Sequence, residues 1–242
     1  MRKIHITLQG KGGVGKSFVA SLIAQQYHQA GRTDELVCVD TDPINRTLQG
    51  YAALNAWALE LMADGGEIIS RNFDALMERA LQEDRDFVID NGASSFVPLM
   101  NYLVENNAVA VLRNAGKKVV VHTVITGGQA IMDTLAGFDT LAKSMPAGAD
   151  IVVWLNEFFG EIEVEGKPFE QMKVYERNKA RVSRMVRIPR QTASTFGKDM
   201  ELLLHKRMTF AEVPASPEFG LMAKQRLAMM GSVIFKQLEQ MV

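Results

Sequence analysis

The sequence contains a single cysteine, Cys38, among 242 residues. One thiol cannot form an internal disulfide, and it excludes a metal cluster held by several cysteines of the same chain. No apolar run approaches the roughly 18 residues that a membrane-spanning helix needs, and the first residues show no export segment. A strong excess of one charge is also missing, because the formal net charge is -1 at pH 7. We therefore expect a cytoplasmic protein without stable membrane insertion and without a global attraction to nucleic acid.

The most informative feature is the glycine-rich run QGKGGVGKS at residues 9–17. It fits the phosphate-binding P-loop pattern, in which glycines let backbone amides turn toward phosphate oxygens. A helix that begins near Lys16 would direct its positive dipole end at the same anion. We expect Lys16 to reach the β- and γ-phosphates of ATP and the Ser17 hydroxyl to bind Mg²⁺. The residues expected to contact nucleotide are Gly10, Lys11, Gly12, Gly13, Val14, Gly15, Lys16, Ser17 and Phe18.

Apolar runs of strand length alternate with helical patterns along the whole chain. This alternation predicts an α/β fold with a doubly wound, mainly parallel sheet covered by helices on both faces. Neither a low-complexity linker nor an internal repeat is visible, so we expect one domain over residues 1–242. The expected strands are 3–9, 36–40, 86–91, 118–125, 151–156 and, more weakly, 185–188. The expected helices are 18–30, 73–82, 96–106, 129–144 and an amphipathic C-terminal helix over about 217–242.

Acidic residues follow two of the expected strands. Asp90 ends an apolar strand, the position of a Walker B carboxylate that holds Mg²⁺ through water. Asp40 ends strand 36–40, and Asp42 follows it. One of these two carboxylates could approach the Mg²⁺ hydration sphere while the other orients an attacking water. A helix cap at Asp90 and a simple turn at Asp40–Pro43 are the alternatives, because Asp and Pro favour such positions.

These motifs together resemble the deviant Walker A ATPases of the ParA/MinD type, whose mark is the second lysine, here Lys11. The resemblance implies a homodimer that encloses ATP, with Lys11 reaching the phosphates of the partner subunit. It further implies that Asp42 positions the hydrolytic water and that Asp40 and Asp90 support Mg²⁺. Asn156 matches the asparagine that reads adenine, and Pro189 lies in a segment that resembles the one packed along the base.

A longer resemblance, to the TraL/StbC-like ATPases of conjugative plasmids, rests on the segments 88–99, 122–130, 152–156 and 166–175. It implies an ATPase, slow without a stimulating partner, that acts in plasmid transfer or partition, together with another plasmid-encoded protein. One departure stands at 91–94, where NGAS replaces the proline-containing segment usual after the Walker B aspartate in ParA/MinD proteins. Two alternatives stay open: a nucleotide-timed adaptor that binds only a protein partner, and a small-molecule ligase similar to dethiobiotin synthetase.

Basic residues are concentrated between Lys167 and Arg190, where eight lysines and arginines face two glutamates. ParA-like proteins bind DNA without sequence preference through basic patches, and such binding is driven by phosphate contacts. If the segment were a helix, Arg177, Arg181 and Arg184 would share one face. The alternatives are a solvated helix face and basic residues that line the nucleotide. The residues considered for DNA contact are Lys173, Arg177, Arg181 and Arg184.

Overall fold

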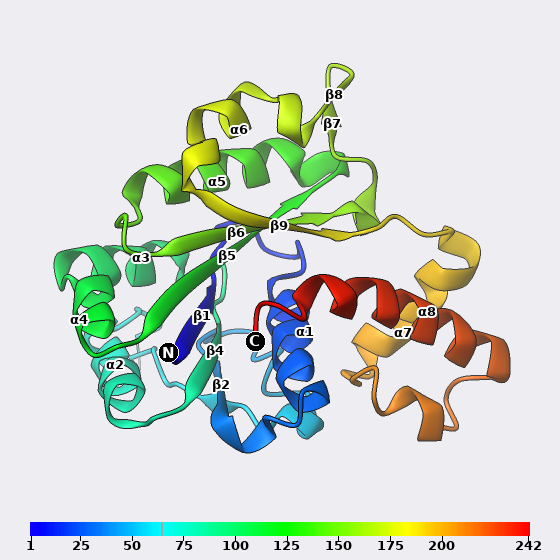
Figure 1. Ribbon diagram of the computed structural model, residues 1–242, viewed down its shortest axis with the longest axis horizontal. Helices are drawn as coiled ribbons and strands as arrows, with labels where there is room; N and C mark the ends of the chain where they lie inside the picture. Colours follow the sequence, from blue (N-terminus) through cyan, green and yellow to red (C-terminus); the bar gives the residue numbers. More distant parts are fainter. Residues whose placement is uncertain (64) are drawn as a thin grey trace.

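A seven-stranded parallel sheet forms the centre of the computed structural model, which describes residues 1–63 and 65–242 (Figure 1). Its strand order is β3-β2-β4-β1-β5-β6-β9. Because β1 lies between β4 and β5, the chain reverses its winding direction there, and the carboxyl end of β1 opens a crevice. The strands are β1 (Lys3–Thr7), β2 (Leu36–Asp40), β3 (Trp57–Ala58), β4 (Asp86–Asp90), β5 (Lys118–Thr126), β6 (Asp150–Asn156) and β9 (Val182–Ile188).

Helices cover both faces of this sheet and divide the core into two apolar clusters (Figure 1). Alternation along β4 shows the division, since Phe87 and Ile89 join one cluster and Val88 the other. One layer contains α2 (Phe73–Gln82), α3 (Phe96–Glu105), α4 (Ala108–Asn114), α5 (Ile131–Ser144) and α6 (Lys173–Asn178). The other layer contains α1 (Lys16–Gln29), α7 (Lys198–His205) and α8 (Leu221–Leu238). A short antiparallel hairpin, β7 (Glu163–Val164) with β8 (Lys167–Pro168), stands outside the sheet.

The expected α/β architecture is confirmed, and the main strands and helices lie within a few residues of their predicted bounds. Helix α1 stops where Gly31 takes a φ of 71°, a conformation that glycine adopts without strain. Sequence patterns missed α4, α7 and the two-residue strand β3, which are all short elements.

The condition under which Arg177, Arg181 and Arg184 would share one face, a continuous helix through this segment, is not met. Helix α6 ends at Asn178, a 3₁₀ turn covers Lys179–Arg181, and Arg184 lies in strand β9. The Asn178 side chain donates hydrogen bonds to Asp139 and to the Val174 carbonyl, which holds the end of α6 against α5. The residues that follow pair with β6 as strand β9, although the spacing of the arginines suits a helix.

The C-terminal helix α8 packs against α1, α7 and β9 through its apolar side, which includes Leu227, Ile234 and Leu238. The chain ends meet, because the Lys3 ammonium donates a hydrogen bond of 2.7 Å to the Met241 carbonyl. Among the described residues, we find no helix with both the length and the apolar character that crossing a membrane requires.

Candidate nucleotide-binding site

The glycine-rich loop follows β1 and leads into α1 at the crevice of the sheet. Gly13 and Gly15 have φ values of 74° and 103°, so this backbone path requires residues without a side chain. The Lys16 ammonium is buried and donates a 2.9 Å hydrogen bond to the Lys11 carbonyl. Burial lowers the pKa of Lys16, while the charges of Asp90 and Asp42 act in the opposite direction. The lysine is thus held inside the loop by the Lys11 carbonyl, and it interacts with the charges of two carboxylates.

Asp90 is fully buried at the end of β4. One carboxylate oxygen accepts a 3.0 Å hydrogen bond from the Thr7 hydroxyl, and the other has no hydrogen-bond partner among the described residues. Burial and the nearby Asp40 charge raise the pKa of Asp90 to about 7, against the opposing effects of Ser17, Thr7 and Lys16. A buried, unpaired carboxylate oxygen is costly to retain and is typical of a position that binds a cation or another ligand.

The two carboxylates after β2 are held by the loop that follows them. Each oxygen of Asp40 accepts one backbone N–H, from Asp42 at 3.0 Å and from Gln49 at 2.9 Å. Asp42 accepts hydrogen bonds from the amides of Ile44 and Asn45. In the structure Asp40 therefore orders the loop that positions Asp42, and direct metal support by Asp40 stays a prediction.

Gly92 allows Asp42 to approach the residues after Asp90. A Cβ atom added to Gly92 would stand only 2.6 Å from the Asp42 carboxyl carbon. The segment NGAS, which departs from the pattern of the ParA/MinD proteins, thus places the loops after β2 and β4 in direct contact. Thr41 strengthens this contact, because its backbone N–H donates a 2.8 Å hydrogen bond to the Asp90 carbonyl.

Lys11, the second lysine of the loop, forms an ion pair with Asp133 in the first turn of α5, with 2.7 Å between nitrogen and oxygen. Gln9 connects the same two elements, since its amide donates hydrogen bonds to the carbonyls of Val124 and Thr134. Gly137 makes room for Gln9, because an added Cβ would lie 1.9 Å from the Gln9 amide oxygen. No sequence pattern indicated Asp133, which lies far from the loop along the chain.

The two residues expected to contact the base lie in different surroundings. Asn156 is buried against the P-loop, where its amide donates to the Val14 carbonyl at 3.0 Å and accepts from the Phe158 N–H at 3.2 Å. Its amide therefore fastens the loop to the end of β6, and reading of adenine stays a prediction. Pro189 is half-buried just after β9 and does not line the cavity at the P-loop.

A cavity of about 360 Å³ opens at the P-loop. Its volume is within the range of small-molecule sites, roughly 300–1,000 Å³. Loop amides, a lysine, a serine hydroxyl and a buried carboxylate with a free oxygen are the groups that a Mg²⁺-bound triphosphate requires. The residues present thus fit such a ligand. The cavity is lined by Gly12, Gly13, Gly15, Lys16, Ser17, Phe18, Asp42, Asn45, Thr47, Tyr51, Ala93 and Leu204.

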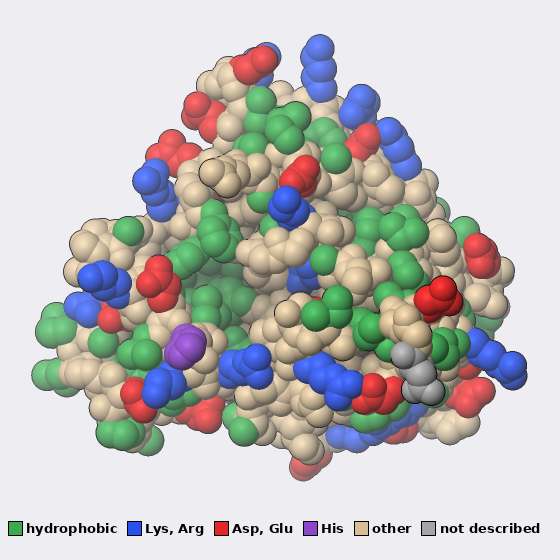
Figure 2. Space-filling view, turned by 180° about the vertical axis from the view of Figure 1, so that it is seen from behind, with side chains coloured by type: hydrophobic (Ala, Val, Ile, Leu, Met, Phe, Trp, Pro, Cys, Tyr) green, Lys and Arg blue, Asp and Glu red, His purple; other side chains and the backbone are tan. Residues whose placement is uncertain are grey.

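The basic segment between Lys167 and Arg190 does not form one positive surface. Arg181 donates hydrogen bonds to the carbonyls of Met145 and Pro146, and Arg184 donates to the Gln237 carbonyl near the end of α8. Arg187 and Arg190 form ion pairs with glutamates. Lysine and arginine side chains are interspersed with acidic ones on the face in Figure 2. DNA contact by the four residues named above stays a prediction.

Strand order, a P-loop after β1, an acidic residue after β4 and the second lysine define a P-loop NTPase of the deviant Walker A, ParA/MinD type. Comparison with known proteins then identifies the family. Two proteins from Escherichia coli, both called Protein TraL, are 51% and 50% identical to this chain over 239 residues. Each alignment covers 99% of this chain and 98% of the relative. The chain belongs to the TraL family.

Solved structures and family profiles add little to this identification. MinD from Aquifex aeolicus is 15% identical, with a TM-score of 0.45 and coverage of 95% of both chains. A plasmid partition protein from Borrelia burgdorferi is 14% identical, with a TM-score of 0.38, covering 84% of this chain and 96% of its own. Both likenesses are weak and concern the fold alone. No protein-family profile matches the chain.

Proposed function

We propose that this protein is a Mg²⁺-ATP-dependent molecular switch with weak ATPase activity, which dimerises around ATP and acts in plasmid transfer or partition. The observation that carries the nucleotide part is that the open glycine-rich loop, buried Lys16 and Ser17 line one cavity. Asp90, with its unpaired oxygen, is buried beside them and interacts with the charge of Lys16. The plasmid part rests on membership of the TraL family and on the resemblance of the motifs to ParA-like ATPases.

Each residue has a separate role in this proposal. Lys16 and the loop amides bind the phosphates, and Ser17 and Asp90 hold Mg²⁺, which supplies positive charge at the phosphates. Asp42, which loop amides hold beside Gly92, orients the attacking water. Lys11 is exposed and reaches the second subunit after it leaves Asp133. Positioning and electrostatic stabilisation account for catalysis of this kind, so no covalent intermediate is required.

The test compares the unaltered protein with Lys16→Ala, Lys11→Ala and Asp42→Ala. Lys16→Ala should lose binding of a fluorescent ATP analogue. Lys11→Ala should retain binding but lose the ATP-dependent dimer, measured by size-exclusion chromatography with light scattering. Asp42→Ala should bind and dimerise but hydrolyse ATP more slowly, by at least about tenfold. A Lys11→Ala protein that still dimerises with ATP contradicts the role of Lys11 in the second subunit.

The same assay separates the ligase from the other readings. Stimulation of ATP turnover by DNA or by another plasmid-encoded protein supports the switch or the adaptor that binds a protein partner. Turnover that depends on a small carboxylate metabolite would instead indicate a ligase. Unchanged hydrolysis by Asp42→Ala would show that another group positions the water.

A further inference from the structure

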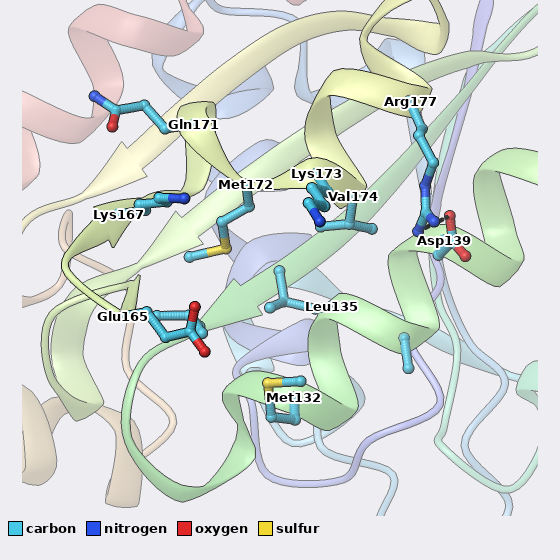
Figure 3. A pocket seen from close by; sticks show the side chains of 12 residues that line it. Met132, Leu135, Asp139, Glu165, Lys167, Gln171, Met172, Lys173, Val174 and Arg177 are labelled. Atoms are coloured by element: carbon cyan, nitrogen blue, oxygen red, sulfur yellow. Dashed lines mark ion pairs between the residues drawn. The ribbon is translucent and has the colours of Figure 1, made fainter.

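A groove separate from the nucleotide cavity lies between α5, the β7–β8 hairpin and the segment that contains α6 (Figure 3). Its volume is about 480 Å³. The apolar base of the groove comprises Met132, Leu135 and Ala136 from α5, together with Val164 and Met172. Met132 has 61% of its surface exposed and lies in this concave setting. Exposed apolar surface in a concave setting is typical of a binding site.

The rim of the groove carries positive charge that the fold leaves uncompensated. Lys167 on β8 and Lys173 on α6 are exposed and have no carboxylate within 4 Å among the described residues. They lie on either side of Met172 in Figure 3. Arg177 differs, because it forms an ion pair of 3.5 Å with Asp139 at one end of the groove. Two ammonium groups therefore remain available to a ligand that also covers the apolar base.

We propose that this groove binds a short, acidic, amphipathic segment of a partner protein. Its apolar side chains would cover Met132 and Met172, and its carboxylates would pair with Lys167 and Lys173. Methionine side chains adapt to ligands of different shape, so two of them in one groove favour the docking of a peptide. This proposal does not depend on the nucleotide chemistry described above.

Charge complementarity selects this occupant over two others. The exposed apolar side of α8, with Met229 and Val233, could in principle enter the groove of a second copy. That helix carries Lys224 and Lys236, which would repel the lysines of the rim. Nucleic acid fits less well, because phosphates require several cations in a row and gain nothing from an apolar base. Glu165 on the hairpin also lines the groove, so the carboxylates of the segment must pair with Lys167 and Lys173 away from it.

The test selects peptides from a random library on the immobilised protein. Selected peptides should combine apolar residues with Asp or Glu and should bind less tightly as salt increases. Ala136→Trp, a change at an exposed residue, fills the groove and should weaken binding by at least about tenfold. Lys167→Glu with Lys173→Glu should weaken it roughly fivefold or more. Met132→Glu should weaken it as well, because it places a negative charge on the apolar base.

Two matched variants control for general effects. Met229→Glu changes an exposed methionine on α8, and Lys198→Glu with Lys236→Glu reverses two exposed lysines outside the groove. Neither should alter peptide binding, and circular dichroism with thermal unfolding verifies that every variant is folded. Three results would overturn the proposal. In the first, the selection yields no peptide that binds above background. In the second, the selected peptides bind Ala136→Trp as tightly as the unaltered protein. In the third, no peptide binds, and the protein instead binds random-sequence duplex DNA through Lys167 and Lys173.

Discussion

Asp90 shows how one residue links stability to ligand binding. Its carboxyl is fully buried, near Asp40, with one oxygen unpaired. The folded protein therefore binds a proton at Asp90 more readily than the unfolded chain, whose aspartates have pKa values of about 3.9. The contribution of the protonated Asp90 carboxyl to folding stability is fully present below about pH 4. It is lost as the pH rises toward about 7. A bound cation would remove this penalty by neutralising the carboxylate.

We predict that Asp90→Asn stabilises the nucleotide-free protein at pH 8 and removes the stabilisation by Mg²⁺-ATP. The amide has the shape of the carboxyl but carries no charge, so the cost of a buried anion disappears. Differential scanning calorimetry should show a melting temperature a few degrees higher without nucleotide. Added Mg²⁺-ATP should raise the melting temperature of the unaltered protein but not that of the variant. Asp34→Asn, which changes an exposed aspartate without an ion pair among the described residues, is the control. A variant that melts lower without ligand and still responds to Mg²⁺-ATP would contradict both parts.

Four elements meet in a buried chain of hydrogen bonds. The Trp154 N–H on β6 donates to Nδ1 of His122 on β5 at 3.0 Å, and Nε2 of His122 lies 2.9 Å from Nδ1 of His5 on β1. Nε2 of His5 lies 3.2 Å from the Tyr27 hydroxyl on α1. Because tryptophan can only donate, Nδ1 of His122 accepts, and each histidine then donates from Nε2. Both rings are therefore neutral, and an added proton would place two donors face to face.

We predict that protonation of these histidines destabilises the fold below pH 6.5. Burial lowers the pKa of His122 to about 3, and burial together with His122 lowers that of His5. The unfolded chain binds protons at both residues below about pH 6.5, so stability falls as the pH decreases from there toward about 3. The slope should reach at most about 1.4 kcal/mol per pH unit for each histidine.

Urea unfolding between pH 7 and pH 5 measures this slope, since ordinary carboxylates hardly titrate there. Asp90→Asn provides the background, because Asp90 titrates in the same window with the opposite sign. In that background, His5→Phe with His122→Phe should show a flatter pH dependence. An equal slope in both proteins would mean that other groups cause the effect.

At the scale of elements, the sequence was most informative where several residues repeat one pattern. Near-continuous apolar runs predicted β2, β4, β5 and β6, because strands buried on both faces tolerate few polar residues. The P-loop was predictable because its backbone path requires glycine at fixed positions. The structure of the basic segment could not be predicted from the spacing of its arginines. That spacing suits a helix, but β9 pairs with β6 instead, and the spacing contains no information about this pairing.

Contacts between distant segments could not be predicted for the same reason. Asp133 reaches Lys11, and Asn156 reaches the Val14 carbonyl, only because the sheet brings their elements to one edge. The expected role of Asn156 came from the family resemblance, and the residue lies at the end of β6. Its hydrogen bonds to the loop depend on side-chain geometry that no motif encodes.

At the scale of the whole molecule, the ion pair between Lys11 and Asp133 connects the P-loop with α5. The same helix lines the groove that we propose as a peptide site. In the proposed dimer, Lys11 must exchange Asp133 for the phosphates in the second subunit. The intramolecular pair therefore competes with dimerisation. Both side chains are about half exposed, so the competition is modest and depends on salt.

We predict that Asp133→Asn strengthens ATP-dependent dimerisation and lowers the dimer dissociation constant by about two- to fivefold. The amide has nearly the volume of the carboxylate but does not hold the lysine by charge, so Lys11 is freed without a change in the loop. Sedimentation equilibrium with ATP at low salt measures the effect, which should shrink as salt screens the pair in the unaltered protein. Asp34→Asn, which removes one negative charge from an exposed site without an ion pair among the described residues, is the matched control. Weaker dimerisation of Asp133→Asn would mean that Asp133 supports the dimer instead of restraining Lys11. The ion pair would then not compete with dimerisation.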